Sequence, residues 1–145
     1  MSTPYESAQL ILKIFEMRRE PVLREARAWF VREFHPSAAD EIFALSPDDN
    51  RKFRMVTGYW DMACSLVTHG AIDRQMFLDA NGELFGAFSK VQPFLADLRQ
   101  RLNSPTAMTH TEQVVMSVPD AEARLEAVRN RLKGLATQQA AAAKS

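Results

Sequence analysis

The sequence predicts an all-α fold, a single-domain helical bundle of about five to seven helices with a central apolar helix near residues 47–69. Helix start and stop signals recur along the chain, and apolar residues between them return every three or four positions. No alternation typical of a strand lasts longer than a few residues. We assign residues 1–138 to one helical domain with a loop over 103–117. Residues 139–145 form an alanine-rich tail, either a frayed helix or a disordered segment.

Proline residues mark the starts of the first two expected helices. Residues 3–6 (TPYE) form a capping box with proline at the first helical position, so a helix should run to about Arg18. Pro21 opens a second helix, which ends at residues 35–36 (HP). A short third helix should follow and end near Leu45.

The strongest start signal in the chain is residues 46–49 (SPDD), which combine a hydroxyl N-cap, a proline and two carboxylates facing the positive end of the helix dipole. The helix should end at Gly70. Its apolar residues span well over half of its circumference, which predicts a position in the middle of the bundle. These residues are Val56, Tyr59, Trp60, Ala63, Cys64, Leu66 and Val67. Gly58 suggests a close approach of another helix or some other local need. Gly82 and Gly86 make a second surface of small residues, where backbones could approach closely.

Three further helices are expected in the second half. Asp73 caps a brief helix through Ala80. A long helix should cover residues 82–102, with a kink where Pro93 leaves a carbonyl group without its usual donor. After the loop, residues 117–120 open a final helix. Its apolar line is Ala121, Leu125, Val128, Leu132 and Leu135.

Composition excludes several classes of function. The chain has 18 basic and 18 acidic residues, so overall charge does not drive nucleic-acid binding. A single cysteine cannot form an internal disulfide. The longest stretch without a charged residue is 62–72, and a membrane helix needs about 20 mostly apolar residues. We find no signal peptide. We therefore expect a cytoplasmic protein with no integral membrane segment and no nucleic-acid partner.

The central helix carries Asp61, Ser65 and His69 at successive four-residue intervals. A catalytic triad needs the histidine between the other two groups at hydrogen-bond distance. Here the serine lies between them, and Asp61 and His69 are about 12 Å apart along the helix axis. We therefore interpret these residues as an exposed polar strip and assign no catalytic residue.

The histidines do not indicate a metal site. His35, His69 and His110 lie at helix ends or in the expected loop, and none has the ligand spacing of metal sites in helical bundles. His69 and Asp73 are the least implausible pair, and Cys64 lies among apolar residues as a small core residue. We assign no metal ligand, no cofactor and no cofactor-binding residue.

A group of arginines near the first two helices is the best anion-binding candidate by charge: Arg18, Arg19, Arg24, Arg27 and Arg32. Glutamates interleave with them, so we favour a solvated face with paired charges. Trp29 and Phe30 could insert into a membrane surface beside this face, but their positions fit the core better.

The segment from the central helix onward resembles a known family. Residues 59–63 (YWDMA), 66–67 (LV), 70–73 (GAID) and 93–95 (PFL) occur in an order similar to that of bacterial helical proteins grouped as a domain of unknown function, the DUF4760-like family. The resemblance covers about residues 50–102. It implies a helical fold in which Gly70 ends a helix, Asp73 caps the next, and Tyr59 and Trp60 anchor the core. It implies no activity and no catalytic residue. The chain departs from the family in having Phe88 where a tryptophan is expected, and in lacking the membrane anchor of some relatives.

Two functions from different classes remain open. The first is a non-enzymatic module that binds an unknown protein or a second copy of itself, suggested by the apolar line from Leu125 to Leu135. That line could equally pack back onto the bundle. The second is a small-molecule- or metal-binding enzyme with its site in the bundle. Four residues of one segment suggest it: Tyr59, Asp61, His69 and Asp73. We favour the first, a protein that is not an enzyme.

Overall fold

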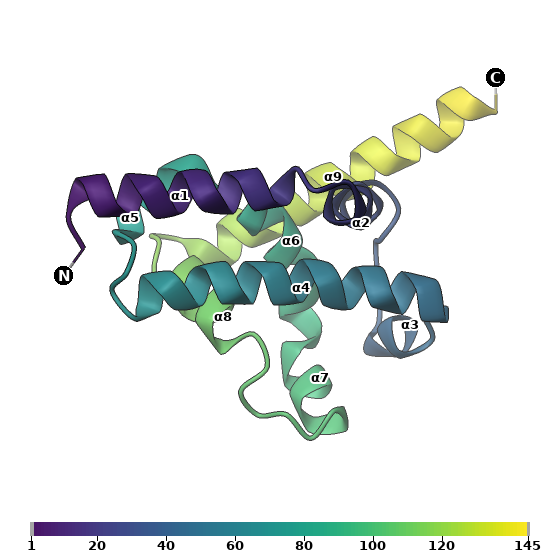
Figure 1. Ribbon diagram of the computed structural model, residues 1–145. Coiled ribbons are helices and arrows are strands. Elements are labelled where there is room, and N and C mark those ends of the chain that lie inside the picture. Colours follow the sequence, from purple (N-terminus) through teal and green to yellow (C-terminus); the bar gives the residue numbers. More distant parts are fainter. Residues whose placement is uncertain (1, 145) are drawn as a thin grey trace.

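The computed structural model describes residues 2–144 and confirms an all-helical single domain (Figure 1). Over these residues the chain forms nine α-helices and one short 3-10 helix, more than expected because several helices span only one or two turns. The elements are α1 Pro4–Arg18, α2 Pro21–Arg32, α3 Ala39–Phe43, α4 Pro47–Thr68, α5 Arg74–Ala80, α6 Glu83–Val91, η1 Gln92–Phe94, α7 Leu95–Arg101, α8 Thr109–Val115 and α9 Ala121–Ala143.

The local start signals place the helices as predicted. In the capping box of α1, the Thr3 hydroxyl accepts from the Glu6 N–H and the Glu6 carboxylate accepts from the Thr3 N–H, both at 3.1 Å. The side chains of Ser46 and Asp73 accept from the N–H groups three residues on, which starts α4 and α5. Gly70 follows α4 at φ +83°, a backbone conformation that glycine adopts without steric cost.

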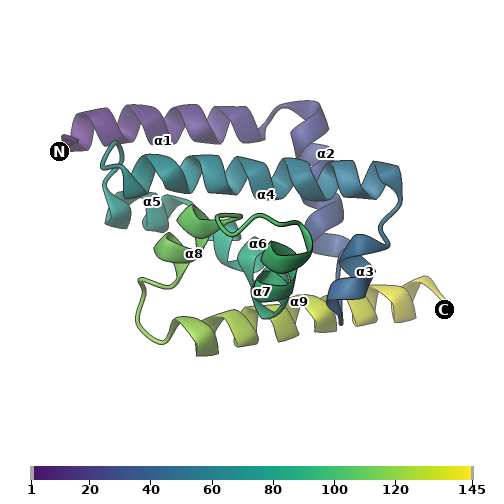
Figure 2. The same ribbon diagram turned by 90° about the horizontal axis from the view of Figure 1, so that it is seen from below.

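The central position of α4 is confirmed. Figure 2 shows α4 running between α1 on one side and α6, α7 and α8 on the other. The Tyr59 hydroxyl donates to the Ile14 carbonyl at 2.7 Å and joins α4 to α1. The buried residues of α4 are Phe53, Val56, Tyr59, Trp60, Ala63, Cys64 and Val67. Among the helices of residues 2–144, none combines the length and hydropathy needed to cross a membrane.

Gly58 does not mark a close approach. It is exposed, and no atom lies within 4 Å of the position that a Cβ would take. The close approach occurs at Gly86 of α6, where a Cβ would lie 3.4 Å from Cδ1 of Leu132 in α9. The approach expected at the Gly82–Gly86 surface is therefore found at Gly86 and not at Gly82, and the one suggested at Gly58 is absent.

The prediction of a single helix over residues 82–102 is wrong. The chain leaves α6 at Val91, passes through the 3-10 turn Gln92–Phe94 and restarts as α7. Pro93 lies in that turn and has no N–H to continue the helix. Because the helix is interrupted, α7 is free to pack beside α3.

Helix α8 lies within the segment expected to be a loop, residues 103–117. Asp61 of α4 explains the difference. Its Oδ1 accepts from both the N–H and the hydroxyl of Thr111, each at 2.9 Å, and so satisfies a free donor in the first turn of α8. A partner 50 residues away in the sequence supplies this cap, so local patterns did not indicate it.

The final helix continues into the alanine-rich tail, the helical one of the two alternatives. α9 runs to Ala143, so the alanine run of the tail assigned to 139–145 is helical, while Ser145 lies outside the described residues. Figure 1 shows the C-terminal end of α9 projecting from the bundle. Its apolar line mostly packs back onto the protein, since Leu125 is fully buried and Val128 and Leu132 lie against Gly86. Leu135 is 48% exposed.

Candidate functional site

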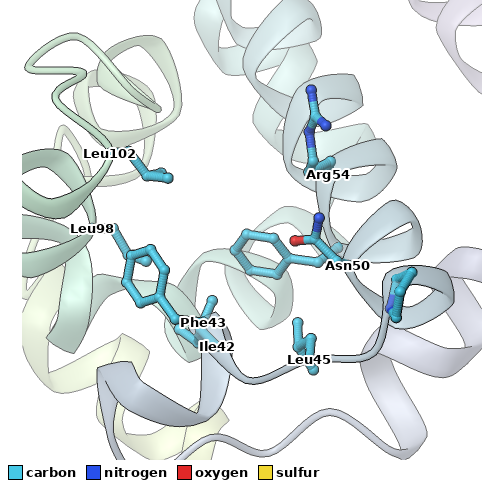
Figure 3. Close-up of a pocket in the computed structure, with 9 residues that line it drawn as sticks. Ile42, Phe43, Leu45, Asn50, Arg54, Leu98 and Leu102 are labelled. Atoms are coloured by element: carbon cyan, nitrogen blue, oxygen red, sulfur yellow. The ribbon is translucent and has the colours of Figure 1, made fainter.

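A hollow on the surface of the described chain lies between α3, the start of α4 and α7, and has a volume of about 710 Å³. We call it the α3–α4–α7 hollow. Its lining residues are Ile42, Phe43, Leu45, Pro47, Asn50, Phe53, Arg54, Leu98 and Leu102. Figure 3 shows Leu98 and Leu102 on one side and Asn50 and Arg54 on the other. The lining is therefore apolar apart from one amide and one guanidinium group.

The floor and the rim of the hollow differ in exposure. Ile42, Phe53 and Leu98 are buried and form part of the core. Phe43 is 36% exposed and Leu102 is 55% exposed. Large apolar side chains at the rim of an apolar hollow are typical of a surface that binds a partner or ligand.

One cation ties the two walls together. The guanidinium of Arg101 in α7 lies 3.9 Å from the ring centroid of Phe43 in α3, and its Nη1 lies 2.7 Å from the Asp40 carboxylate. Helix α3 is itself held at its start by Glu41, whose carboxylate accepts from the Ser37 and Ala38 N–H groups. These contacts link α3 and α7 at the exposed rim of the hollow.

The α4 side of the hollow contributes one cation, Arg54, and Arg51 lies beside it. Arg51 donates to Asp48 at 2.7 Å, and this hydrogen bond lowers the pKa of the Asp48 carboxyl. Arg54, one turn further on, forms no ion pair with any residue between 2 and 144. Its guanidinium group therefore remains available to an anionic group of a ligand or partner.

Asp61, Ser65 and His69 do not form a catalytic site. Asp61 caps α8, and Nδ1 of His69 lies 2.8 Å from the Ser65 carbonyl oxygen of its own helix. The interpretation of Asp61 as part of an exposed strip is wrong, because its carboxylate is engaged by Thr111.

The structure brings together two histidines that the sequence did not pair. The rings of His69 and His110 have centroids 5.4 Å apart, and Nδ1 of His110 lies 2.7 Å from the Thr68 hydroxyl. Asp73 caps α5 with its carboxylate. Within the described residues, no group of three or more His, Cys, Asp or Glu side chains could hold a metal ion.

The remaining candidates have structural positions. Cys64 is fully buried, and burial, with a smaller contribution from Asp61, raises the pKa of its thiol to about 12. Trp29 and Phe30 lie in the core, as the sequence favoured. Of the arginine group, Arg27 pairs with Glu83 of α6 and not with a neighbour on its own helix.

Sequence reasoning missed the apolar rim. Phe43 lies in a helix of only five residues, and Leu102, the last residue of the apolar pattern of 82–102, directly follows α7. The only local signal is that both are large apolar residues at helix ends. Their meeting depends on the break at Pro93.

One comparison finds a match. The family model described as "Domain of unknown function (DUF4760)" matches residues 5–118. Neither the curated proteins nor the solved structures contain a match. The matched residues include every element that lines the α3–α4–α7 hollow, whereas α9 lies beyond them.

Proposed function

The chain belongs to the DUF4760 family, a domain of unknown function, and from that premise we propose that it is a non-enzymatic module that binds a segment of another protein in the α3–α4–α7 hollow. The observation that carries this proposal is the open apolar hollow with exposed Phe43 and Leu102 at its rim. The occupant is a segment that combines apolar side chains with carboxylates.

The shape of the surface favours an elongated occupant. A second, shallower hollow of about 420 Å³ lies beside the first, over the same N-terminal turns of α4. It shares Pro47, Asn50 and Arg54 with the first and adds Arg51 and Met55. The two together make a trough along α4, in which a chain segment can lie with several side chains in contact.

Charge defines the chemistry of that segment. Arg51 and Arg54 both lie on the trough, and Arg54 has no carboxylate partner among residues 2–144. A carboxylate of the partner beside Arg54 would form a charge-assisted hydrogen bond at the edge of an apolar contact. This arrangement, an apolar centre with a charged rim, is that of many protein–protein interfaces.

The lining favours binding over catalysis. None of its nine residues is a histidine, cysteine, serine, aspartate or glutamate. Asn50 and Arg54 can orient a bound group, but neither is a general base or nucleophile at neutral pH. A second candidate function is the binding of a small apolar carboxylate, since the volume of about 710 Å³ also suits such a ligand.

The test is selection of short random peptides against the full chain. We expect enrichment of sequences that combine apolar residues with Asp or Glu. Leu102→Glu, which places a charge in the hollow, should weaken binding of the selected peptides by about tenfold or more. Arg54→Gln should weaken only the acidic peptides.

The matched control is Leu12→Glu, because Leu12 is an exposed apolar residue of α1 outside the hollow. Peptide binding should survive this change. Two outcomes contradict the proposal: selection without enrichment, and equal losses in both leucine variants. A native mass spectrum that reveals a bound small carboxylate, lost in Leu102→Glu, would favour the second candidate. A dimer lost in the same variant would identify a second copy as the occupant.

A further inference from the structure

We infer that a basic crevice where the end of α2, α6 and α9 meet binds a phosphate-type anion, either inorganic phosphate or a phosphate monoester. The crevice is lined by His35, Pro36, Lys90, Arg129 and Lys133. Four of these five side chains are basic. The inference concerns a site separate from the α3–α4–α7 hollow and does not depend on its function.

Lys90 forms the floor of the basic crevice. Its side chain belongs to a residue that is only 3% exposed, and its Nζ donates to the carbonyl groups of Phe30 at 2.5 Å and Val31 at 2.9 Å. Both acceptors are neutral groups near the end of α2. Burial lowers the pKa of Lys90 to about 8, so the ammonium is still mostly protonated at pH 7. A positive charge is thus buried without a carboxylate beside it.

Two further cations come from α9. Arg129 donates from Nε to the Ser89 carbonyl at 2.6 Å and from Nη2 to Gln92 at 3.3 Å, while its Nη1 has no acceptor among residues 2–144. Lys133 is exposed and lies four residues further along the same helix. Like charges at this spacing repel one another.

His35 completes the basic crevice from the chain segment after α2. Its Nε2 lies 3.1 Å from the Arg32 carbonyl oxygen, and Nδ1 has no partner among the described residues. Burial lowers the pKa of His35, and the charges of Lys90 and Lys133 lower it further. A neutral ring has a single N–H, which Nε2 uses on the Arg32 carbonyl, so Nδ1 can donate to an anion only when the ring is protonated. A bound anion would favour that protonation.

No carboxylate neutralises this cluster. Within residues 2–144, none of the ion pairs involves His35, Lys90, Arg129 or Lys133. The hydrogen bonds of Lys90 to the carbonyl groups of α2 would by themselves give Lys90 a structural role. Lys133 has no such structural contact, and its convergence with three other basic groups favours an anionic ligand.

The size and charge of the crevice define the anion. The enclosed volume is about 20 Å³, which holds one water-sized atom. One oxygen of a phosphate can therefore enter toward Lys90 while the others remain at the mouth, within the range of the long Arg129 and Lys133 side chains. A phosphate monoester carries about 1.5 to 2 negative charges at pH 7 on three acceptor oxygens, and inorganic phosphate carries more than one, whereas a carboxylate carries one charge on two oxygens. Phosphate thus matches several cations better.

The experiment titrates the full chain at pH 7 with inorganic phosphate and, separately, with O-phosphoserine. Sodium chloride keeps the ionic strength constant, and binding is followed by isothermal calorimetry and by the melting temperature. We expect saturable binding and a rise in melting temperature with at least one of the two probes. Equal affinities indicate a free ion, and tighter binding of the monoester indicates a phosphoryl group carried by a larger molecule.

Lys133→Gln should weaken the affinity by about tenfold, the loss of one charge-assisted hydrogen bond, without affecting the fold because the side chain is exposed. The matched control is Lys13→Gln, an exposed lysine of α1. Equal stabilisation of the protein and both variants would show a general salt effect and overturn the inference. Absence of binding by both probes would also overturn it.

Discussion

The charged residues at the two ends of α6 have different kinds of partner. At its start, Glu83 accepts from Nε and Nη2 of Arg27 at 2.8 and 3.0 Å, and Arg18 lies 3.9 Å away. Near its other end, Lys90 is bound only by neutral carbonyl groups. The first cluster pairs a carboxylate with arginines, and the second gathers basic groups around no carboxylate.

The difference separates charged groups whose donors are all used within the fold from those whose donors are not. Arg27 also donates from Nη1 to the Arg18 carbonyl at 3.1 Å, so its guanidinium group is bound on all sides within the chain. It joins the α1–α2 corner to α6. The basic crevice has donors that no residue of 2–144 accepts, and the anion proposed above would accept from them.

The largest expected effect in this comparison is on the Glu83 side. Glu83→Gln removes the charge that holds Arg27, whose side chain is 19% exposed, and should lower the free energy of unfolding by about 2 kcal/mol. Urea denaturation measures this loss. Glu16→Gln is the control, because Glu16 pairs with Lys13 on the exposed surface and should change stability by less than about 0.5 kcal/mol. Equal changes in the free energy of unfolding for the two substitutions would show that the Glu83 charge does not stabilise the fold.

The next effect is a pH dependence from Lys90. Its pKa of about 8 in the folded protein lies below the ordinary value of 10.5, so the unfolded chain binds the proton more tightly. The cost of burying the ammonium is complete well below pH 8 and is relieved as the pH rises from 8 toward 10.5. From pH 8 to 9, the free energy of unfolding of the unsubstituted protein should therefore increase by about 1 kcal/mol more than that of Lys90→Met.

The comparison with Lys90→Met isolates this contribution. Cys64 acts in the opposite direction, because its thiol ionises more readily in the unfolded chain, but it does so in both proteins. Lys13→Met, at an exposed lysine, should retain the pH dependence of the unsubstituted protein. If Lys90→Met keeps the same slope as well, Lys90 does not titrate in this range.

The smallest effect concerns Lys133 in the absence of phosphate. Lys133→Gln removes a positive charge one helical turn from Arg129 and should raise the free energy of unfolding by about 0.3 kcal/mol at low salt. Urea midpoints at low and high sodium chloride measure this gain, which should shrink as salt screens the repulsion. A loss of stability would mean that Lys133 has a favourable partner within the fold.

Local signals predicted much of the fold and little of the candidate site. The starts at Thr3, Ser46 and Asp73 and the stop at Gly70 were predicted correctly because each depends on groups within about one helical turn. The periodicity of residues 82–102 suggested one helix, but the periodic pattern continued through the Pro93 break. Periodicity records which side of a helix is apolar, not whether the helix continues.

The sequence by itself determined the helical class, most helix ends and the central place of α4, since hydrogen bonds close in sequence and the breadth of an apolar face decide these. Only the tertiary structure decided α8, whose cap comes from Asp61, and the hollow, whose walls are joined by Asp40 and Arg101. It also decided that Lys90 lies near Lys133 without a carboxylate. Such contacts join residues far apart in the chain, and their geometry exists only once the helices have packed.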